Sequence, residues 1–163
     1  MKKKLAIASL LLGSSLFAGG IDGLSLKIGA GNVEIGSLSE SATKIGAEFS
    51  YIKDKTKQYD VYMDLGFYKM ESGSLTFMGM GGRYEVAKNI QVGISVGLSG
   101  YAFSETSSSE TDLSGFAYGL NAKYKINQNH SFVADYKSGT LTDKTGILDV
   151  DVTAASVNYV YSF

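Results

Sequence analysis

The stretch Val157-Asn158-Tyr159-Val160-Tyr161-Ser162-Phe163 ends the chain, and the fold that we expect follows from it. Successive side chains of a strand point to opposite faces, so the odd-numbered residues here, all Val or aromatic, share one face. Asn158 and Ser162 lie on the other face, with Val160 as the exception. Large aromatic rings at a chain terminus are unusual in water, but they fit a strand whose rings face lipid.

The N-terminal segment has the three parts of a secretory signal peptide. Lys2–Lys4 are basic, Leu5–Leu12 form an apolar run, and Leu16–Gly20 supply small residues. The apolar run is shorter than the roughly 20 residues that a membrane-spanning helix needs. We therefore expect residues 1–20 to be a cleaved signal peptide and residues 21–163 to form a single domain. The alternative is that this segment stays attached as an anchor.

The composition favours strands and argues against several other classes of protein. The 163 residues include 20 Gly, 11 Tyr and 8 Phe, but no Cys, Pro or Trp. Without Cys, neither a disulfide framework nor a lipid-anchored lipoprotein is available. The formal net charge of −1 gives no support for nucleic acid as a partner.

Alternation of apolar and polar residues at the two-residue period of a strand recurs along the chain. It predicts eight strands: Gly23–Ala30, Thr43–Ile52, Tyr59–Tyr68, Leu75–Val86, Ile90–Phe103, Gly115–Ile126, Ser131–Ser138 and Leu148–Phe163. In the last of these the apolar phase slips near Thr153-Ala154, because Val152 is out of step with Val157. We expect a β-bulge at that point.

Short and long connections alternate between these strands. The short polar connections are Lys53–Gln58, Ala87–Asn89 and Asn127–His130. The second set is rich in Ser, Thr and acidic residues, and consists of Gly31–Ala42, Ser104–Ser114, Gly139–Ile147 and the shorter Met70–Ser74. This pattern is typical of an up-and-down barrel with tight turns at one end and open loops at the other.

Two features indicate that the polar face is the inside of this barrel. Gly is frequent on that face, and it makes room for charged side chains in the narrow interior of an eight-stranded barrel. Aromatic residues bound the apolar face at both ends, as they do at bilayer interfaces. They are Phe49, Tyr51, Tyr59, Tyr84, Tyr124, Phe132, Tyr161 and Phe163 near the short turns, and Phe67, Phe116, Tyr118 and Tyr136 toward the longer loops. We therefore predict an all-β fold, an eight-stranded antiparallel up-and-down transmembrane β-barrel.

The signal peptide, the eight amphipathic strands and a terminal strand ending in Tyr161-Ser162-Phe163 resemble a small bacterial outer-membrane barrel of the OmpA/OmpX type. The resemblance covers essentially all of residues 21–163, and it implies a location in the bacterial outer membrane. It also implies that Tyr159, Tyr161 and Phe163 belong to the signal read by the barrel-assembly machinery. The implied partners are that machinery, periplasmic chaperones, membrane lipid and lipopolysaccharide, and we expect a monomer.

The predicted inner face carries ionisable side chains of both signs. They are Lys27, Lys44, Glu48, Asp60, Asp64, Arg83, Glu85, Lys123, Asp135 and Lys137. Unpaired charges in a narrow lumen are costly, so we expect these side chains to pair across the barrel. Such a network either plugs the lumen or forms the gate of a narrow ion path.

Catalytic, cofactor and metal sites have little support in the sequence. The single histidine, His130, is followed by Ser131, but neighbours in a strand point to opposite faces and make a poor catalytic couple. Asp143, Asp149 and Asp151 lack the full spacing of a calcium loop. We therefore predict no enzymatic activity, no cofactor and no bound metal.

The expected function is non-enzymatic, in envelope integrity or in surface interaction through the extracellular loops. The loop Ser104–Asp112, which is polar and acidic, is one candidate for such contacts. A narrow small-solute or ion channel is the alternative. A lipid-modifying outer-membrane enzyme and a soluble lipocalin-like carrier have less support.

Overall fold

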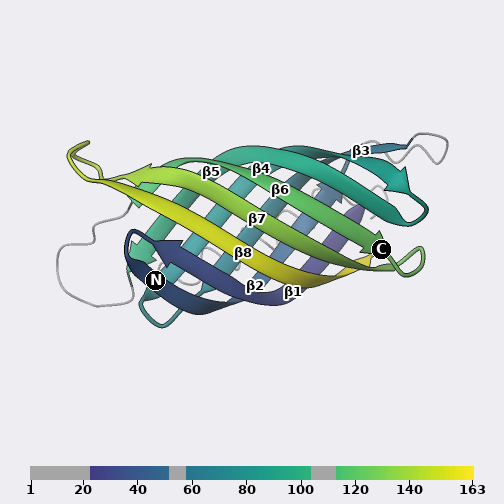
Figure 1. The fold of residues 1–163 in the computed structure, drawn as a ribbon, viewed down its shortest axis with the longest axis horizontal. Coiled ribbons are helices and arrows are strands. Elements are labelled where there is room, and N and C mark those ends of the chain that lie inside the picture. Colours follow the sequence, from purple (N-terminus) through teal and green to yellow (C-terminus); the bar gives the residue numbers. More distant parts are fainter. Residues whose placement is uncertain (1–22, 52–57, 104–112) are drawn as a thin grey trace.

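The computed structural model describes residues 23–51, 58–103 and 113–163, and these form one closed antiparallel barrel (Figure 1). Its strands are β1 (Leu24–Ile35), β2 (Leu38–Ser50), β3 (Tyr59–Lys69), β4 (Gly73–Ala87), β5 (Ile90–Phe103), β6 (Leu113–Lys125), β7 (His130–Thr142) and β8 (Asp149–Ser162). Each strand pairs with the next along the chain, and β8 pairs with β1. The predicted eight-stranded up-and-down barrel is therefore confirmed.

Some predicted segments cannot be compared with this fold. The predicted signal peptide, residues 1–20, lies outside the described residues, as do most of the connections Lys53–Gln58 and Ser104–Ser114. Within the part of the chain that is described, no helix has the length and apolar character needed to cross a bilayer.

Backbone pairing between β1 and β8, the first and last strands, closes the barrel. Leu26 lies opposite Tyr161, and the register continues without a break until Ile35 lies opposite Val152. Figure 1 shows the purple β1 beside the yellow β8, with the C-terminus at one end of the barrel. We call this the C-terminal end and the opposite one the loop end. Because a closed sheet has no unpaired edge, this topology meets the requirement for β-structure in hydrocarbon.

The predicted loop Gly31–Ala42 is wrong, because the structure has strand there. β1 and β2 stay paired until Ile35 lies opposite Leu38, so only a tight turn at Gly36-Ser37 joins them. Gly36 has a φ of +59°, a conformation that residues with a side chain adopt less readily.

The connection predicted at Gly139–Ile147 is also shorter in the structure. β7 continues to Thr142 and β8 begins at Asp149. The side chains explain both errors, because inward and outward positions exchange character toward the loop end. Toward the loop end of β1, for example, inward Val33 is apolar and outward Glu34 is polar, the opposite of the middle of the strand. The apolar residues therefore move from outward to inward positions within one strand.

The predicted bulge near Thr153-Ala154 is wrong as well. β8 pairs with β7 and with β1 in unbroken register across this point. Among the described strand pairs, the register shifts only between Glu85 and Ala87, beside the β4–β5 turn. The apparent slip in β8 arises because its inward side chains change from polar to apolar along a regular strand.

The middle of the barrel has its apolar side chains on the outside. Ile94, Val96 and Val157 are at least 60% exposed, whereas Lys44 and Glu48 are buried in the lumen. Aromatic side chains also face outward near both ends of this apolar band. Those among the exposed large side chains are Tyr51, Tyr59, Tyr84, Tyr124, Phe132, Tyr159, Tyr161 and Phe163 toward the C-terminal end, and Phe67, Phe103, Phe116, Tyr118 and Tyr136 nearer the loop end.

Candidate functional site: the lumen and the outer collar

Glu48 is the centre of an ion-pair network in the lumen. The guanidinium of Arg83 donates two parallel hydrogen bonds to its carboxylate, at 2.6 and 2.7 Å. The ammonium of Lys27 lies 2.9 Å from the same carboxylate, and that of Lys123 lies 3.4 Å away. These four side chains come from β2, β4, β1 and β6, so the ion pairs connect different walls of the barrel.

Two further carboxylates pair with the remaining lysines. Asp64 accepts hydrogen bonds from Lys27 at 2.6 Å and from Lys137 at 2.9 Å. Asp135 accepts one from Lys44 at 2.8 Å. The side chains of these five residues are at most 6% exposed, so the charges have little access to bulk water. Each charge is stabilised mainly by its partners, because an isolated charge would not be tolerated at this depth.

Aromatic and amide groups complete the surroundings of these cations. The guanidinium of Arg83 lies 3.8 Å from the ring centroid of Tyr62, and its Nε donates to the Asn121 side-chain oxygen at 2.6 Å. The Asn121 amide in turn donates to the Tyr62 hydroxyl at 2.7 Å. The ammonium of Lys137 lies 3.6 Å from the ring centroid of Phe77. Rings in these positions stabilise a cation by their electrostatic attraction to it.

The ten charged residues predicted for the inner face differ in their surroundings. Eight are buried in the ion pairs just described: Lys27, Lys44, Glu48, Asp64, Arg83, Lys123, Asp135 and Lys137. Asp60 lies at the margin of the group, with a carboxylate oxygen 3.6 Å from Arg83. Glu85 does not join them, because it pairs with Lys125 at 3.3 Å where both side chains are about one-third exposed, 34% and 36%.

The sequence reasoning missed several polar members of this site. Tyr62 and Asn121 contact Arg83, while Asn158 donates hydrogen bonds to Asp135 and to Ser156. All four lie at inward positions of their strands, so the same two-residue period could have found them. They were missed because the prediction considered only charged side chains.

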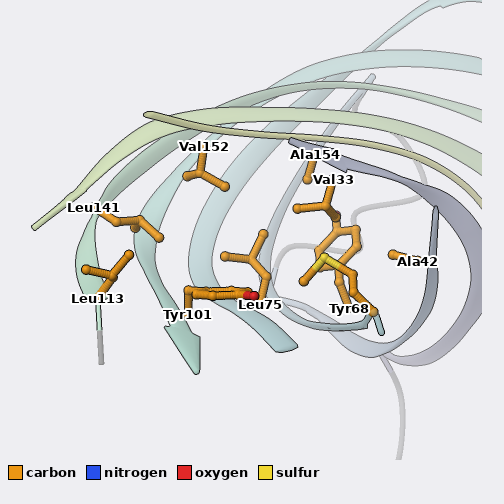
Figure 2. Close-up of a cluster of buried hydrophobic side chains, with 10 residues drawn as sticks. Val33, Ala42, Tyr68, Leu75, Tyr101, Leu113, Leu141, Val152 and Ala154 are labelled. Atoms are coloured by element: carbon orange, nitrogen blue, oxygen red, sulfur yellow. The ribbon is translucent and has the colours of Figure 1, made fainter. Parts of the chain in front are cut away.

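Toward the loop end, apolar side chains fill the lumen instead (Figure 2). We call this cluster the apolar seal: Val33, Ala42, Tyr68, Met70, Leu75, Tyr101, Leu113, Leu141, Val152 and Ala154. Each is at most 6% exposed, and every one of the eight strands contributes at least one member. Figure 2 shows the labelled side chains gathered together inside the barrel wall. The prediction of a polar inner face did not include this cluster.

A small cavity marks the junction between the ion-pair network and the apolar seal. Its volume is about 10 Å³, and Tyr68, Phe77, Ser99, Lys137 and Ala154 are among the residues that line it. This is room for about one water molecule. The lumen of the described barrel is therefore filled on one side of this cavity by the ion pairs, with inward Val133 and Val160 among them, and on the other side by the apolar seal.

The outer surface changes character at the level of the apolar seal. Along β8, outward Val157 is apolar, whereas outward Thr153 and Asp151 are polar. Along β1, exposed Ile28 is followed on the same face by Glu34. We call residues 32–43 and 138–153 the collar. On its strands the outward side chains are mostly polar and the inward ones apolar, the arrangement of a protein in water and the reverse of the lipid-facing band. Leu38, Ile147 and Leu148, at or beside its two turns, are exposed apolar exceptions.

Hydrogen bonds order the polar side chains on the collar. The hydroxyls of Thr140 and Thr142 donate to Asp151 at 2.9 Å and to Asp149 at 2.7 Å. The collar contains five acidic residues and a single lysine, and is therefore negatively charged. The acidic residues are Glu34, Glu40, Asp143, Asp149 and Asp151, and the lysine is Lys144.

The turn between β7 and β8 is held together by one carboxylate. Asp143 accepts hydrogen bonds from the Thr145 hydroxyl and from the backbone N–H groups of Leu148 and Ile147. These bonds, with that of Thr145 as the largest contribution, lower the pKa of the Asp143 carboxyl below its ordinary value. Gly146 has a φ of +72°, which completes the tight path of the chain.

His130 and Ser131 lie on opposite sides of the barrel wall. Ser131 is buried on the inner face, whereas the His130 ring contacts the Tyr159 hydroxyl and lies 5.3 Å from the ring of Tyr161 on the outer face. Among the described residues, no group of three or more His, Asp or Glu side chains could hold a metal ion.

The comparisons with known proteins agree with this architecture. The profile of the family described as outer membrane protein beta-barrel domain matches residues 7–163. No curated protein matches the sequence.

Several solved structures share the fold at low sequence identity. Neisserial surface protein A (NspA) is 15% identical, with a TM-score of 0.61 over 87% of this chain and 98% of that one. Ail of Yersinia pestis, in complex with the heparin analogue sucrose octasulfate, is 15% identical, with a TM-score of 0.59 over 87% and 99%. The N-terminal β-barrel domain of Pseudomonas aeruginosa OprF is 15% identical, with a TM-score of 0.50 over 84% and 97%.

Proposed function

This chain belongs to the outer membrane protein β-barrel domain family, and from that premise we propose that it acts without catalysis through its loop end. Membership of the family makes it an integral barrel of the bacterial outer membrane. The proposed role is in envelope integrity or in interaction at the cell surface. The C-terminal end then faces the periplasm, and the collar and its loops face outward.

The collar is the observation that carries this proposal. A strand needs about 9–11 residues to cross a bilayer, whereas β7 has 13 and β8 has 14. The additional residues are polar outside and packed on the apolar seal inside, so they suit water rather than lipid. Strands that continue beyond the lipid form a firm support for contacts outside the membrane.

The filled lumen supports a role other than transport. Ion pairs and apolar side chains occupy the described interior, and the cavity between them has a volume of only about 10 Å³. Solutes larger than water would have to displace several buried side chains. This filling favours a barrel that acts through its outer surface over the alternative of a narrow channel.

The charge of the collar indicates the kind of surface that it could contact. Five carboxylates and one lysine repel polyanions, so a sulfated ligand such as the one bound to Ail would be disfavoured here. A cationic surface would be favoured, and its attraction would weaken as the salt concentration rises.

We also propose partners for the barrel in its biogenesis and in the membrane, and membership of the family supports this proposal. They are the barrel-assembly machinery, periplasmic chaperones, membrane lipid and lipopolysaccharide. Tyr159, Tyr161 and Phe163 face outward on β8 and at the chain's end, where an assembly factor could reach them. We propose that these three side chains form the assembly signal and that the barrel is a monomer.

Two measurements test the proposed function. The protein purified from outer membranes should insert into planar lipid bilayers without discrete conductance steps, and reproducible steps would favour a channel instead. Cells carrying Glu34→Gln, Asp149→Asn and Asp151→Asn together should adhere less to a polylysine surface than wild-type cells. The matched control is Glu85→Gln with Lys125→Gln, a pair away from the collar. Equal adhesion of all three strains, at equal amounts of barrel, would contradict a role for the collar.

A further inference from the structure

The lumen is filled by two clusters of different chemistry that lie one after the other. The ion-pair network around Glu48 and Asp64 holds charges that bind to each other. The apolar seal presents mostly carbon to the lumen, with the hydroxyls of Tyr68 and Tyr101 as its polar atoms, and it is closer to the loop end. We propose that these are two independent barriers in series, and that the apolar seal alone excludes ions when the ion-pair network is opened.

The composition of the apolar seal supports this role. Every strand contributes to it, so the seal extends around the whole circumference of the barrel. Tyr68, Leu141 and Val33 are at most 1% exposed, which leaves no gap beside them for a hydrated ion. An ion passing between apolar side chains would lose its hydration without gaining replacement ligands, and hydrophobic constrictions close channels in this way.

The two barriers are held together by separate interactions. No side-chain hydrogen bond or ion pair found in the lumen joins a member of one to a member of the other. The two clusters adjoin where Lys44 lies opposite Tyr68 and Lys137 lies opposite Ala154 on neighbouring strands, with the Lys44 ammonium 4.9 Å from the Tyr68 ring centroid. The cavity lined by Ser99 and Phe77 lies at their junction. Removing charges near Glu48 would therefore leave the packing of Leu113 and Leu141 in place.

An exchange of ion-pair partners in the lumen should change how far water enters the barrel without opening a path for ions. Breaking the Glu48–Arg83 pair would admit water from the C-terminal end as far as the junction cavity. It would not open a path across the membrane, because the apolar seal still closes the loop end. This inference deepens the proposed closed lumen, on which it rests, by assigning its closure to two barriers.

Ser99 provides a probe between the barriers. Its side chain is buried and lines the junction cavity, and the chain contains no Cys, so Ser99→Cys introduces a single thiol. The ion-pair network is opened by Glu48→Ala with Arg83→Ala, which removes one charge of each sign. The apolar seal is opened by Leu113→Ser with Leu141→Ser. Each pair of substitutions, and both pairs together, is placed in the Ser99→Cys protein.

Two readouts are compared on the barrel purified from outer membranes. Labelling by a small charged thiol reagent in detergent micelles reports whether water reaches the junction from either end. Conductance in planar bilayers reports whether both ends are open. The Ser99→Cys protein should show neither labelling nor conductance. Opening either barrier should allow labelling without conductance, and opening both should give labelling and discrete conductance steps.

Specific results would overturn the inference. Conductance after opening the ion-pair network alone would mean that the apolar seal is no barrier. An absence of conductance in a folded protein with both barriers opened would mean that other side chains close the lumen. Conductance of the wild-type barrel would instead contradict the proposed function, so the two failures are distinguishable.

A folding control accompanies each variant. The change in electrophoretic mobility on heating, together with β-sheet circular dichroism, shows whether the barrel is folded. If Leu113→Ser with Leu141→Ser does not fold, the milder Leu113→Ala with Leu141→Ala replaces it. The same outcomes then apply, because the smaller side chains also remove the apolar contacts that close the loop end.

Discussion

At the scale of single residues, Glu48 shows how a membrane barrel tolerates buried charge. Its carboxylate contacts the cations of Arg83, Lys27 and Lys123, and all four side chains are at most 9% exposed. A buried ion pair gains little over apolar packing, but removal of one partner leaves the others uncompensated. The free energy that the intact network contributes to folding is therefore smaller than the free energy that is lost when one of its members is removed.

Replacement of this carboxylate should be strongly destabilising. We expect Glu48→Gln to lower the free energy of unfolding by about 3–5 kcal/mol, because it leaves buried cations without their counter-charge. Urea unfolding in lipid vesicles measures the effect. The control is Glu85→Gln, which breaks the partly exposed pair with Lys125 and should cost no more than about 1 kcal/mol. Equal losses in the two variants would show that burial of the pair is unimportant.

The turn between β7 and β8 should respond to acid through Asp143. Hydrogen bonds lower the pKa of this carboxyl, so their contribution is complete above the ordinary Asp value of about 3.9 and is lost as the pH falls through the lowered value. We expect the amide N–H chemical shifts of Ile147 and Leu148 to stay constant from pH 7 to about 4 and to move below it.

The matched variant for this turn is Asp143→Asn. It keeps an oxygen that can accept hydrogen bonds but removes the titrating group. The acid-induced movement of the Ile147 and Leu148 signals should therefore disappear. A transition that persists in Asp143→Asn would assign the pH dependence to another group.

At the scale of elements, the barrel closes where β1 pairs with β8, and the two backbones approach each other closely there. Gly29 lies against β8, and a Cβ atom added there would be 2.2 Å from the Val157 carbonyl oxygen and 2.8 Å from the Asn158 Cα. The neighbouring backbone could not move without disturbing the β1–β8 ladder. Glycine at this position is explained by close approach of two strands rather than by flexibility.

Gly29→Ala should accordingly destabilise the closure of the barrel. We expect a loss of about 1–3 kcal/mol in the free energy of unfolding, as for overpacking elsewhere in proteins. Gly66→Ala is the control, because a Cβ there would meet the flexible Lys44 side chain at 3.4 Å. Urea unfolding of both variants in vesicles measures the difference. A Gly29→Ala protein as stable as Gly66→Ala would contradict the steric account.

At the scale of the whole molecule, the barrel combines two folding environments along one axis. Lipid surrounds the band that carries Val157 and Ile94, and the charges there are inside. In the proposed arrangement water surrounds the collar, where Asp151 is outside and Val152 is inside. The same regular strands serve both environments, because a reversal of side-chain character needs no change of backbone.

Substitution by lysine on the outer face of β8 locates the boundary between these environments. Val157→Lys should lower the free energy of unfolding in lipid by about 2–4 kcal/mol, the cost of a lysine near the middle of the bilayer. Thr153→Lys, four residues away on the same face, should have little effect because the collar is in water. The measurement is urea unfolding in lipid vesicles. Similar costs at the two positions would place Thr153 in the lipid as well.

Much of the fold could be predicted from local patterns. The two-residue period marks the core of every strand, and the aromatic residues and terminal Phe163 indicate that the apolar face meets lipid. Because successive side chains of a strand point to opposite faces, the same period also distinguishes inward Arg83 from outward Tyr84. The predicted loop Gly31–Ala42 was wrong because polarity was taken as a sign of loop, whereas in the collar it marks the outward face of a strand.

The sequence by itself therefore determined the central part of each strand and which of its side chains face inward there, because both depend on residues close together in the chain. The location in the outer membrane was indicated by the resemblance of the whole pattern to a known family. Only the tertiary structure decided which charges pair and where the lumen closes. Lys44 and Asp135 are 91 positions apart, and they meet because of the register of all the strands between them. The apolar seal likewise needs all eight strands at one level. Such contacts depend on the stagger that closes the barrel, which no single segment of the chain specifies.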